Sequence, residues 1–180
     1  MKYSKENLNS SYSKSEFVFF WGHTPAKNGE ITQTCLSQWW KCTFEEDGVI
    51  FCCAEQYMMY QKALLFEDQE HADEILKAKD PKRIKALGRL VRNFDAEIWD
   101  AHKQEIVFQG NILKFSQNPE LKQYLIGTGN KILVEASPYD SIWGIGMRAG
   151  SAGICDPQKW KGQNLLGFLL MEARERILTE

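Results

Sequence analysis

The sequence predicts an α+β fold that is rich in helices and carries a small β-sheet, within one domain over residues 15–180. Three observations lead to this fold class. Helical periodicity with capping residues recurs along most of the chain, β-rich runs are few and short, and 43% apolar residues in 180 are enough for a buried core. Residues 1–14 are polar, and we expect them to form a flexible N-terminal arm.

The β-rich runs lie mainly in the first third of the chain. The aromatic run EFVFFW predicts a strand that begins at Phe17, and HTPAKNGEI predicts a turn after it. Two further β-rich pieces, 35–43 and 49–52, flank Glu-Asp-Gly at 46–48 and predict a hairpin. The run KILVEAS, 131–137, predicts one more strand.

Helices are expected where an apolar periodicity follows a capping signal. Asp80 with Pro81, and Asp95, supply such signals, and we expect Asn164 to cap the last helix. The predicted helices cover residues 54–66, 71–79, 81–91, 96–116, 119–127 and 165–178. On the helix over 96–116 one side carries Ile98, His102, Ile106, Gln109 and Leu113.

Charge and hydropathy narrow the function classes. The net charge of −2 gives no overall electrostatic footprint for nucleic acid. No run approaches the roughly 18 consecutive apolar residues of a membrane span. The polar N-terminus also lacks the apolar segment of a signal peptide. We therefore expect a cytoplasmic protein that does not contact a membrane.

The cysteines point to packing rather than to chemistry. There are five of them, an odd number, and none forms a CxxC pair. This pattern predicts reduced cysteines used as small apolar residues, without a disulfide framework or a metal site. A redox or metal protein built on Cys42, Cys52 and Cys53 is the alternative.

Glu55 and Lys62 occupy an unusual place for charged residues. On a helix over 54–66 they lie within about 20° of each other in angle, two turns apart, next to apolar residues such as Met59. Polar Gln56 lies on the opposite side, which inverts the usual amphipathic arrangement. Either each charge pairs with an opposite charge from another element, or both line a pocket and act on a ligand.

A second cluster of candidate residues lies in the loop EASPYDSIWGIG, 135–146. Loops that follow strands often carry binding groups, and an indole such as Trp143 offers a flat surface for a base. The simpler interpretation is a turn aspartate, Asp140, and a core tryptophan. For Trp99, on the helix over 96–116, a core position is likewise the default.

Arg89 and Arg92 lie near the end of the helix predicted over 81–91. Guanidinium groups match the oxygens of a phosphate, so both residues are candidate phosphate ligands. The simpler interpretation is that these cations complement the negative end of the helix dipole.

The chain resembles the NADAR family, the YbiA-like N-glycosidases, in four segments that occur in the same order. These segments are AEQYMMYQKALLF at 54–66, GRLVRNFDAEIWDAHK at 88–103, KFSQNPELKQYLIGTGNKILVEASPYDSIWGIG at 114–146 and NLLGFLLMEARERI at 164–177. The resemblance runs from about Phe17 to Leu178 and implies a YbiA-like fold. It also implies cleavage of an N-glycosidic bond between a ribose and a nitrogen base.

The resemblance assigns roles to five residues and names two substrate classes. Its functional glutamate corresponds to Glu55, its lysine to Lys62, its tryptophan in the middle helix to Trp99, and its D-x-x-W-G pair to Asp140 and Trp143. The substrate classes are ribosylamino-pyrimidine phosphates of riboflavin synthesis and ADP-ribosylated guanine, so ADP-ribosylated nucleic acid is a candidate partner. No metal or organic cofactor is implied.

The segment FFWGHTP, 19–25, departs from the Phe-Leu-Ser-Asn-Phe-like start of many family members. Trp21 and His23 stand where those members carry polar groups. We therefore expect Trp21 and His23 to contact the substrate and to influence which base or phosphate is accepted.

The chemistry of the reaction suits these residue types. Breaking a ribosyl C1′–N bond builds positive charge on the sugar, which a carboxylate such as Glu55 or Asp140 stabilises. The sequence leaves open which carboxylate acts as acid or base. It also leaves open whether Lys62 acts as an ammonium or attacks C1′ as an amine to form an imine. A module that binds ADP-ribose or a nucleotide without cleaving it is the alternative function.

Overall fold

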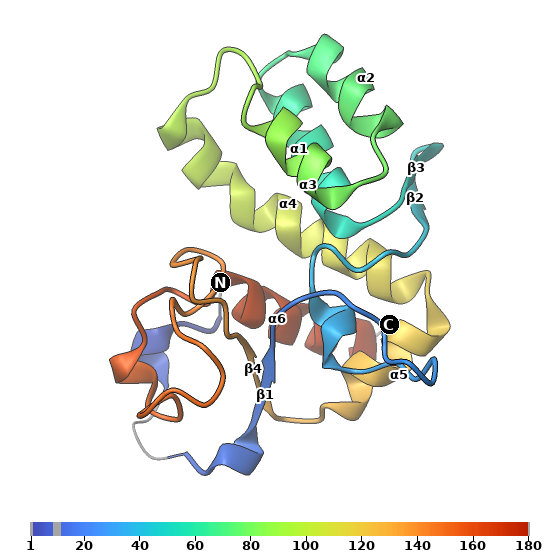
Figure 1. Ribbon diagram of the computed structural model, residues 1–180. Coiled ribbons are helices and arrows are strands. Elements are labelled where there is room, and N and C mark those ends of the chain that lie inside the picture. Colours follow the sequence, from blue (N-terminus) through green and yellow to red (C-terminus); the bar gives the residue numbers. More distant parts are fainter. Residues whose placement is uncertain (1, 9–11, 180) are drawn as a thin grey trace. The chain divides into compact units, whose positions relative to one another are not determined.

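The computed structural model describes residues 2–8 and 12–179 (Figure 1). Contacts between Cα atoms divide the chain into two units, one of residues 38–118 and the other of the residues before and after that segment. None of the helices among the described residues is long and apolar enough to cross a membrane.

The central unit, residues 38–118, contains a β-hairpin and four helices. The hairpin pairs β2 (Phe44–Glu46) with β3 (Val49–Phe51) in antiparallel register. The helices are α1 (Ala54–Leu65), α2 (Gln69–Lys77), α3 (Pro81–Gly88) and α4 (Ala96–Ser116). Helix α1 packs against the other three, as the green and yellow ribbons of Figure 1 show.

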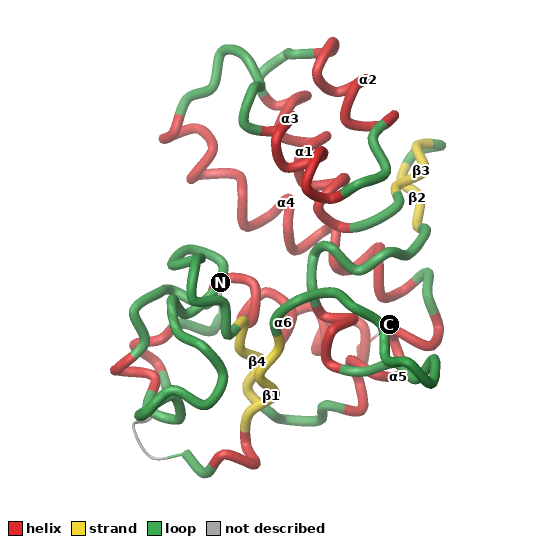
Figure 2. The backbone as a smooth tube through the Cα atoms, in the orientation of Figure 1, coloured by secondary structure: helices red, strands yellow, loops and turns green. Residues whose placement is uncertain are grey.

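The flanking unit is built around a parallel pair of strands. Strand β1 (Phe17–Phe20) pairs with β4 (Ile132–Glu135), and α6 (Leu165–Thr179) packs against β4 (Figure 2). Helix α5 (Pro119–Gly127) and the 3-10 turns η1 (Lys5–Asn7), η2 (Lys14–Glu16), η3 (Gln33–Leu36) and η4 (Pro157–Lys159) complete this unit. Near the N-terminus, Lys2 Nζ donates to Glu175 on α6 at 2.8 Å.

Most predicted elements are confirmed, with shifted boundaries. The first hairpin strand begins at Phe44 rather than within 35–43, because residues 33–36 form the 3-10 turn η3. Helix α3 ends at Gly88, earlier than predicted, and the chain then turns. On α4 the most buried side carries Lys103, Val107, Gly110, Asn111 and Lys114, which is a different side from the one that carries Ile98, which is exposed.

The side of α1 opposite to Glu55 is buried or half-buried, whereas its polar residues led us to expect exposure to solvent. Gln56 is fully buried there, and its side chain accepts a hydrogen bond from the Cys52 N–H at 2.7 Å. Its amide nitrogen donates to three carbonyls at the C-terminal end of α2, those of Ile75, Leu76 and Ala78. A polar residue is stable in this position because its hydrogen bonds are made within the protein.

Asn164 stands at the start of α6 but does not cap it with its side chain, as the sequence suggested. Its carbonyl accepts from Phe168 N–H at 3.2 Å, while its side chain reaches back to β4. There Oδ1 accepts from the Glu135 N–H at 3.0 Å and Nδ2 donates to the Leu133 carbonyl at 2.9 Å. The residue is fully buried and has φ of 56°, a left-handed conformation that asparagine tolerates better than most residues.

We expect Asn164→Ala to lower the free energy of unfolding by about 3 kcal/mol. It leaves the Glu135 N–H and the Leu133 carbonyl without their side-chain partners, at about 1–3 kcal/mol for each buried group. Urea denaturation followed by circular dichroism measures the change. The exposed Asn130→Ala is the matched control, with an expected change within about 0.5 kcal/mol. Equal losses in the two variants would contradict the assignment.

Candidate active site

Glu55 is a buried carboxylate in the first turn of α1, with 3% of its surface exposed. Its backbone N–H donates to the carbonyl of Gln38 at 2.9 Å, and the Gln38 side chain donates to Asn111 Oδ1 at 3.0 Å. Asn111 in turn donates to the Val107 carbonyl on α4. A chain of buried amides therefore fixes the start of α1, and the positive end of its dipole favours negative charge at this position.

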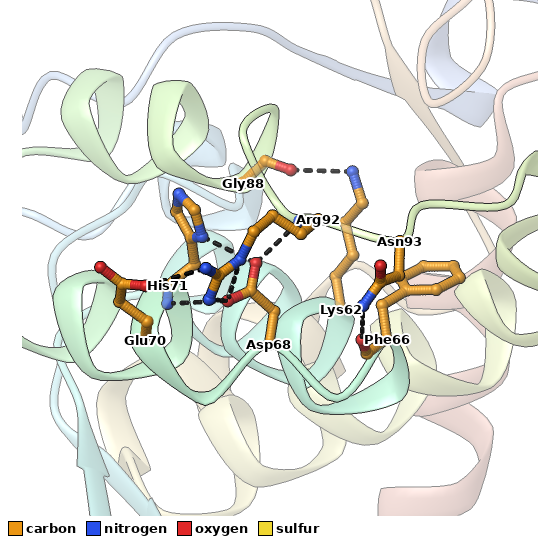
Figure 3. Close-up of polar contacts among 8 residues, drawn as sticks. All are labelled: Lys62, Phe66, Asp68, Glu70, His71, Gly88, Arg92 and Asn93. Carbon is orange, nitrogen blue, oxygen red and sulfur yellow. Dashed lines mark hydrogen bonds and ion pairs between the residues drawn. The ribbon is translucent and has the colours of Figure 1, made fainter.

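Lys62 lies two turns further along α1 in a half-buried position. Its Nζ donates to the Gly88 carbonyl at 2.8 Å, at the C-terminal end of α3 (Figure 3). The same atom lies 4.2 Å from the ring centroid of Phe94 and 5.6 Å from that of Trp99. The ammonium is therefore held by a helix-end carbonyl and by two aromatic rings.

No carboxylate among the described residues forms an ion pair with Lys62, so the first of the two explanations for the charged pair does not hold for this residue. Burial lowers the pKa of Lys62 below its usual value of 10.5, because removal from water disfavours the charged form. A lowered pKa raises the fraction of neutral amine near pH 7, and the neutral amine is the nucleophilic form.

Gly88 allows the end of α3 to approach α1 closely. A Cβ atom at this position would lie 1.9 Å from Sδ and 2.7 Å from Cγ of Met59 on α1. Any larger residue would therefore push the two helices apart or displace Met59. The position of the Gly88 carbonyl, which accepts the hydrogen bond from Lys62, therefore depends on the close packing of α3 against α1.

An ionic network centred on the buried Asp68 lies at the far end of α1. The Asp68 side chain has no exposed surface, and its Oδ1 accepts from Arg92 Nη2 at 2.6 Å. Its Oδ2 lies 2.7 Å from His71 Nδ1, and Arg92 Nη1 also pairs with Glu70 at 3.0 Å (Figure 3). The Arg92 guanidinium is thus engaged within the protein, while Arg89 forms the C-cap of α3.

In the flanking unit, the predicted residues follow the carboxyl ends of β1 and β4. Trp21 comes directly after β1, and its half-exposed ring lies 6.1 Å from that of Tyr139 in the loop after β4. Because β1 and β4 are parallel, both segments leave the same edge of the strand pair. This edge is where ligands commonly bind in sheets with parallel strands. His23 is half-buried in the segment after Trp21.

Asp140 shapes the loop that contains Trp143. Its Oδ1 accepts from the N–H groups of Ile142 at 2.9 Å and Trp143 at 2.8 Å. This is the turn role that the sequence offered as the simpler interpretation. Oδ2 takes no part in these two hydrogen bonds, so a substrate role for that oxygen is compatible with the turn role. Trp143 is half-buried, so the core position suggested for it is reached only in part.

None of the five cysteines forms a disulfide bond, and two of them, Cys52 and Cys53, are joined by a hydrogen bond between their thiols. A hydrogen bond from the Cys53 thiol lowers the pKa of Cys52 to about 7, and the ammonium groups of Lys79 and Lys41 act in the same direction. Cys53 is buried and forms the N-cap of α1, next to Glu55. Among the residues that the structure describes, no group of three or more metal-ligating side chains is suited to a metal ion.

The structure groups the predicted residues and adds others that the sequence did not single out. It brings Lys62 and Trp99 together in the central unit and places Trp21 beside the Asp140 loop in the flanking unit. The additional residues are Gln38, Asp68, Gly88, Phe94 and Asn111. Phe94 and Gly88 lie within the segment GRLVRNFDAEIW, and a glycine inside the helix predicted over 81–91 was the one visible signal.

The sequence of residues 19–178 matches the model of the NADAR domain. The chain belongs to the NADAR domain family. This match covers both units, from the end of β1 to the last turn of α6.

Curated relatives of this NADAR domain have names that describe an enzyme class. The N-glycosidase R617 of Acanthamoeba polyphaga mimivirus is 48% identical over 165 residues, which cover 89% of this chain and 95% of that protein. The N-glycosidase YbiA of Escherichia coli (strain K12) is 31% identical over 134 residues, or 74% of this chain and 75% of that protein. The riboflavin biosynthesis protein PYRR, chloroplastic, of Zea mays is 32% identical over 143 residues, which are only 21% of its length.

A solved structure supports the same fold. The NMR structure of the E. coli protein YbiA superposes with a TM-score of 0.72 at 25% identity, over 94% of this chain and 89% of that one. The fold class predicted for this NADAR domain, a helix-rich α+β fold like that of YbiA, is therefore confirmed.

Proposed function

We propose that this NADAR domain is a hydrolase that cleaves a ribosyl C1′–N bond to a nitrogen base. The observation that carries the proposal is the environment of Lys62. It is a half-buried amine that has no carboxylate partner among the residues that the structure describes, and it lies near two aromatic rings on the same helix as the buried Glu55. The N-glycosidase names of the relatives support this enzyme class.

The reaction needs stabilisation of positive charge at C1′ and a route for water. Glu55 supplies the negative charge, and Asp140 is the second carboxylate, which acts on the base or holds the ribose hydroxyls. Trp99, Trp143, Trp21 and His23 are the proposed substrate-binding residues. The base leaves with a proton on its nitrogen, and the hydroxyl of water ends on C1′.

Lys62 offers a covalent route for the same reaction. Its neutral amine attacks C1′, the C1′–N bond breaks, and the base departs with a proton. The sugar ring then opens at the C1′–O4′ bond as O4′ takes up the second proton of the amine, which leaves the ring-opened sugar bound to Lys62 as an imine. Water adds to this imine, which releases the sugar as an aldehyde and restores the amine. The lowered pKa of Lys62, together with the lack of an ion pair to any carboxylate in the described part of the chain, favours this route over a purely electrostatic role.

Two substrate classes fit the proposal. Ribosylamino-pyrimidine phosphates gain support from the relative named for riboflavin biosynthesis, and ADP-ribosylated guanine, free or in nucleic acid, is the other class. The metal-free and cofactor-free reaction, the cytoplasmic location and the single domain over residues 15–180 stay predictions.

Incubation of the purified protein with a panel of ribosyl-base compounds tests the proposed function. The panel contains both substrate classes and unmodified nucleosides, and chromatography measures release of the free base. We expect turnover of at least one of the two classes and none of the unmodified nucleosides. Tight binding by calorimetry with intact ligand in every case would instead identify a binding module.

A further inference from the structure

The last residue of α3 and the segment that follows it supply two of the three groups that surround the Lys62 ammonium. Gly88, at the end of α3, gives the carbonyl that accepts the hydrogen bond, and Phe94, near the end of the following segment, gives the closer of the two rings. Phe94 is 47% exposed, and its ring packs edge-to-face on the buried ring of Phe66, with 5.3 Å between the ring centroids. The environment of Lys62 therefore depends on what holds residues 89–94.

Arg92 lies between Gly88 and Phe94, and a single carboxylate holds both its backbone and its side chain. Asp68 Oδ2 accepts from the Arg92 backbone N–H at 2.7 Å. Asp68 Oδ1 accepts from Arg92 Nη2 at 2.6 Å and from Nε at 3.2 Å. Hydrogen bonds between charged partners are the strong ones, so this contact is a firm attachment for the segment.

Asp68 is in turn fixed to the end of the helix that carries Lys62. Its backbone N–H donates to the carbonyl of Ala63, the residue after Lys62, at 2.9 Å. Its carboxylate also caps α2 by accepting from the His71 N–H. Figure 3 shows how Asp68 and Lys62 project from neighbouring turns of the chain toward the segment that carries Gly88 and Arg92.

The backbone next to both partners is strained. Glu67, just before Asp68, and Asn93, just after Arg92, each have φ of 55° in the left-handed region. Residues other than glycine adopt the left-handed region at a cost in energy, so surrounding contacts must hold the backbone in this conformation. The Asn93 side chain adds a weak contact, 3.5 Å from the Phe66 carbonyl.

We propose that Asp68 is a positioning residue for Lys62, because it holds Arg92 and thereby keeps the Gly88 carbonyl and the Phe94 ring against the ammonium. The inference rests on the proposed function only in treating Lys62 as the reacting amine. Without the Asp68 contact, residues 89–94 move away and water reaches Nζ. Because burial is what lowers the pKa of Lys62, exposure returns that pKa toward about 10.4.

The experiment measures Lys62 itself in addition to turnover. Trace acetylation with acetic anhydride, read by peptide mass spectrometry as a function of pH, gives the pKa and the accessibility of Lys62 in folded protein. The variants are Asp68→Asn, which keeps the shape and removes the charge, and Arg92→Lys, which keeps the charge and changes only a half-exposed side chain. Arg92→Lys keeps the test available if Asp68→Asn does not fold.

Two controls separate positioning from general loss of stability. Glu70→Gln removes the outer ion pair of Arg92 and leaves the Asp68 contact in place. Gly110→Ala destabilises the same unit elsewhere, since its Cβ would lie 2.6 Å from Tyr57 Cδ1. We expect both controls to leave the Lys62 titration as in the wild type.

In Asp68→Asn we expect the pH midpoint of Lys62 acetylation to rise and the acetylation rate at high pH to increase. We expect the same changes, to a smaller extent, in Arg92→Lys. At neutral pH, kcat should fall about tenfold for each pH unit of that rise. An unchanged Lys62 titration in folded Asp68→Asn or Arg92→Lys overturns the inference. A shifted titration with an unchanged pH profile of kcat supports the inference and contradicts the amine role of Lys62 in the proposed function.

Discussion

Glu55→Gln is expected to lower kcat by about a thousandfold on any substrate that the wild type cleaves. The substitution keeps the size of the side chain and removes the negative charge that stabilises the developing charge on C1′. Loss of one electrostatic or acid–base group in an active site typically costs about 10²–10⁴ in rate. Steady-state kinetics on the substrate found in the panel measures the change.

The controls for Glu55→Gln address folding and charge. Glu74→Gln removes an exposed carboxylate of the same unit and should leave kcat unchanged. Because Glu55 is 3% exposed, circular dichroism and a thermal melt must show that Glu55→Gln is folded. A folded Glu55→Gln with wild-type kcat would remove Glu55 from the proposed mechanism.

Asp140→Asn is the companion variant for the second carboxylate. An asparagine oxygen can still accept from the N–H groups of Ile142 and Trp143, so the loop should keep its conformation. We expect kcat to fall by about 10–100-fold, less than for Glu55→Gln, since Asp140 is half-buried and carries the turn as well. Wild-type turnover in both Glu55→Gln and Asp140→Asn would refute the site assignment.

Lys62→Arg is expected to abolish measurable turnover if the amine attacks C1′. The arginine keeps the positive charge, the helix-end carbonyl partner and the aromatic neighbours, but it has no neutral amine near pH 7. The covalent and electrostatic roles therefore predict different outcomes, because a charge alone would preserve a substantial part of the rate. Sodium borohydride added during turnover should trap the imine as a sugar adduct at Lys62, detected by intact and peptide mass.

The pH dependence gives an independent test of the same role. Burial places the pKa of Lys62 below 10.5, so the neutral fraction rises as pH increases through that lowered value. On the covalent route kcat should therefore rise with pH and level off above a midpoint that lies below that of an ordinary lysine. Absence of an adduct together with a rate that falls over this range would contradict amine attack.

The helices and strands were largely predictable because their signals are local. Asp95 caps α4 with its own side chain, and Pro81 follows the Asp80 cap of α3, as the residue types suggested. The role of Asn164 was not predictable, because its side chain bonds a strand about thirty residues earlier in the chain. A capping pattern describes neighbours in sequence and carries no information about such contacts.

The candidate site was predictable only in part, because helical spacing is a local signal and contacts between distant residues are not. Helical spacing placed Glu55 and Lys62 on the same side of α1, but it could not show that Lys62 faces Phe94 and Gly88. Asp68 and Arg92 looked like an ordinary acidic residue and a helix-end cation. Their importance comes from a part-buried contact across 24 positions of sequence, which periodicity does not encode.

The pairing of β1 with β4 has a consequence for the order of events during synthesis. Phe17 aligns with Ile132, and the whole of residues 38–118 leaves the ribosome between these two partners. Residues 38–118 form one of the two units and are continuous in sequence, so this unit can begin to fold before β4 is synthesised and can pair with β1. Pairing between such remote partners is slow, because a large loop must close first. The nascent chain therefore carries an unmatched aromatic strand for much of its translation, when chaperones have most reason to bind it.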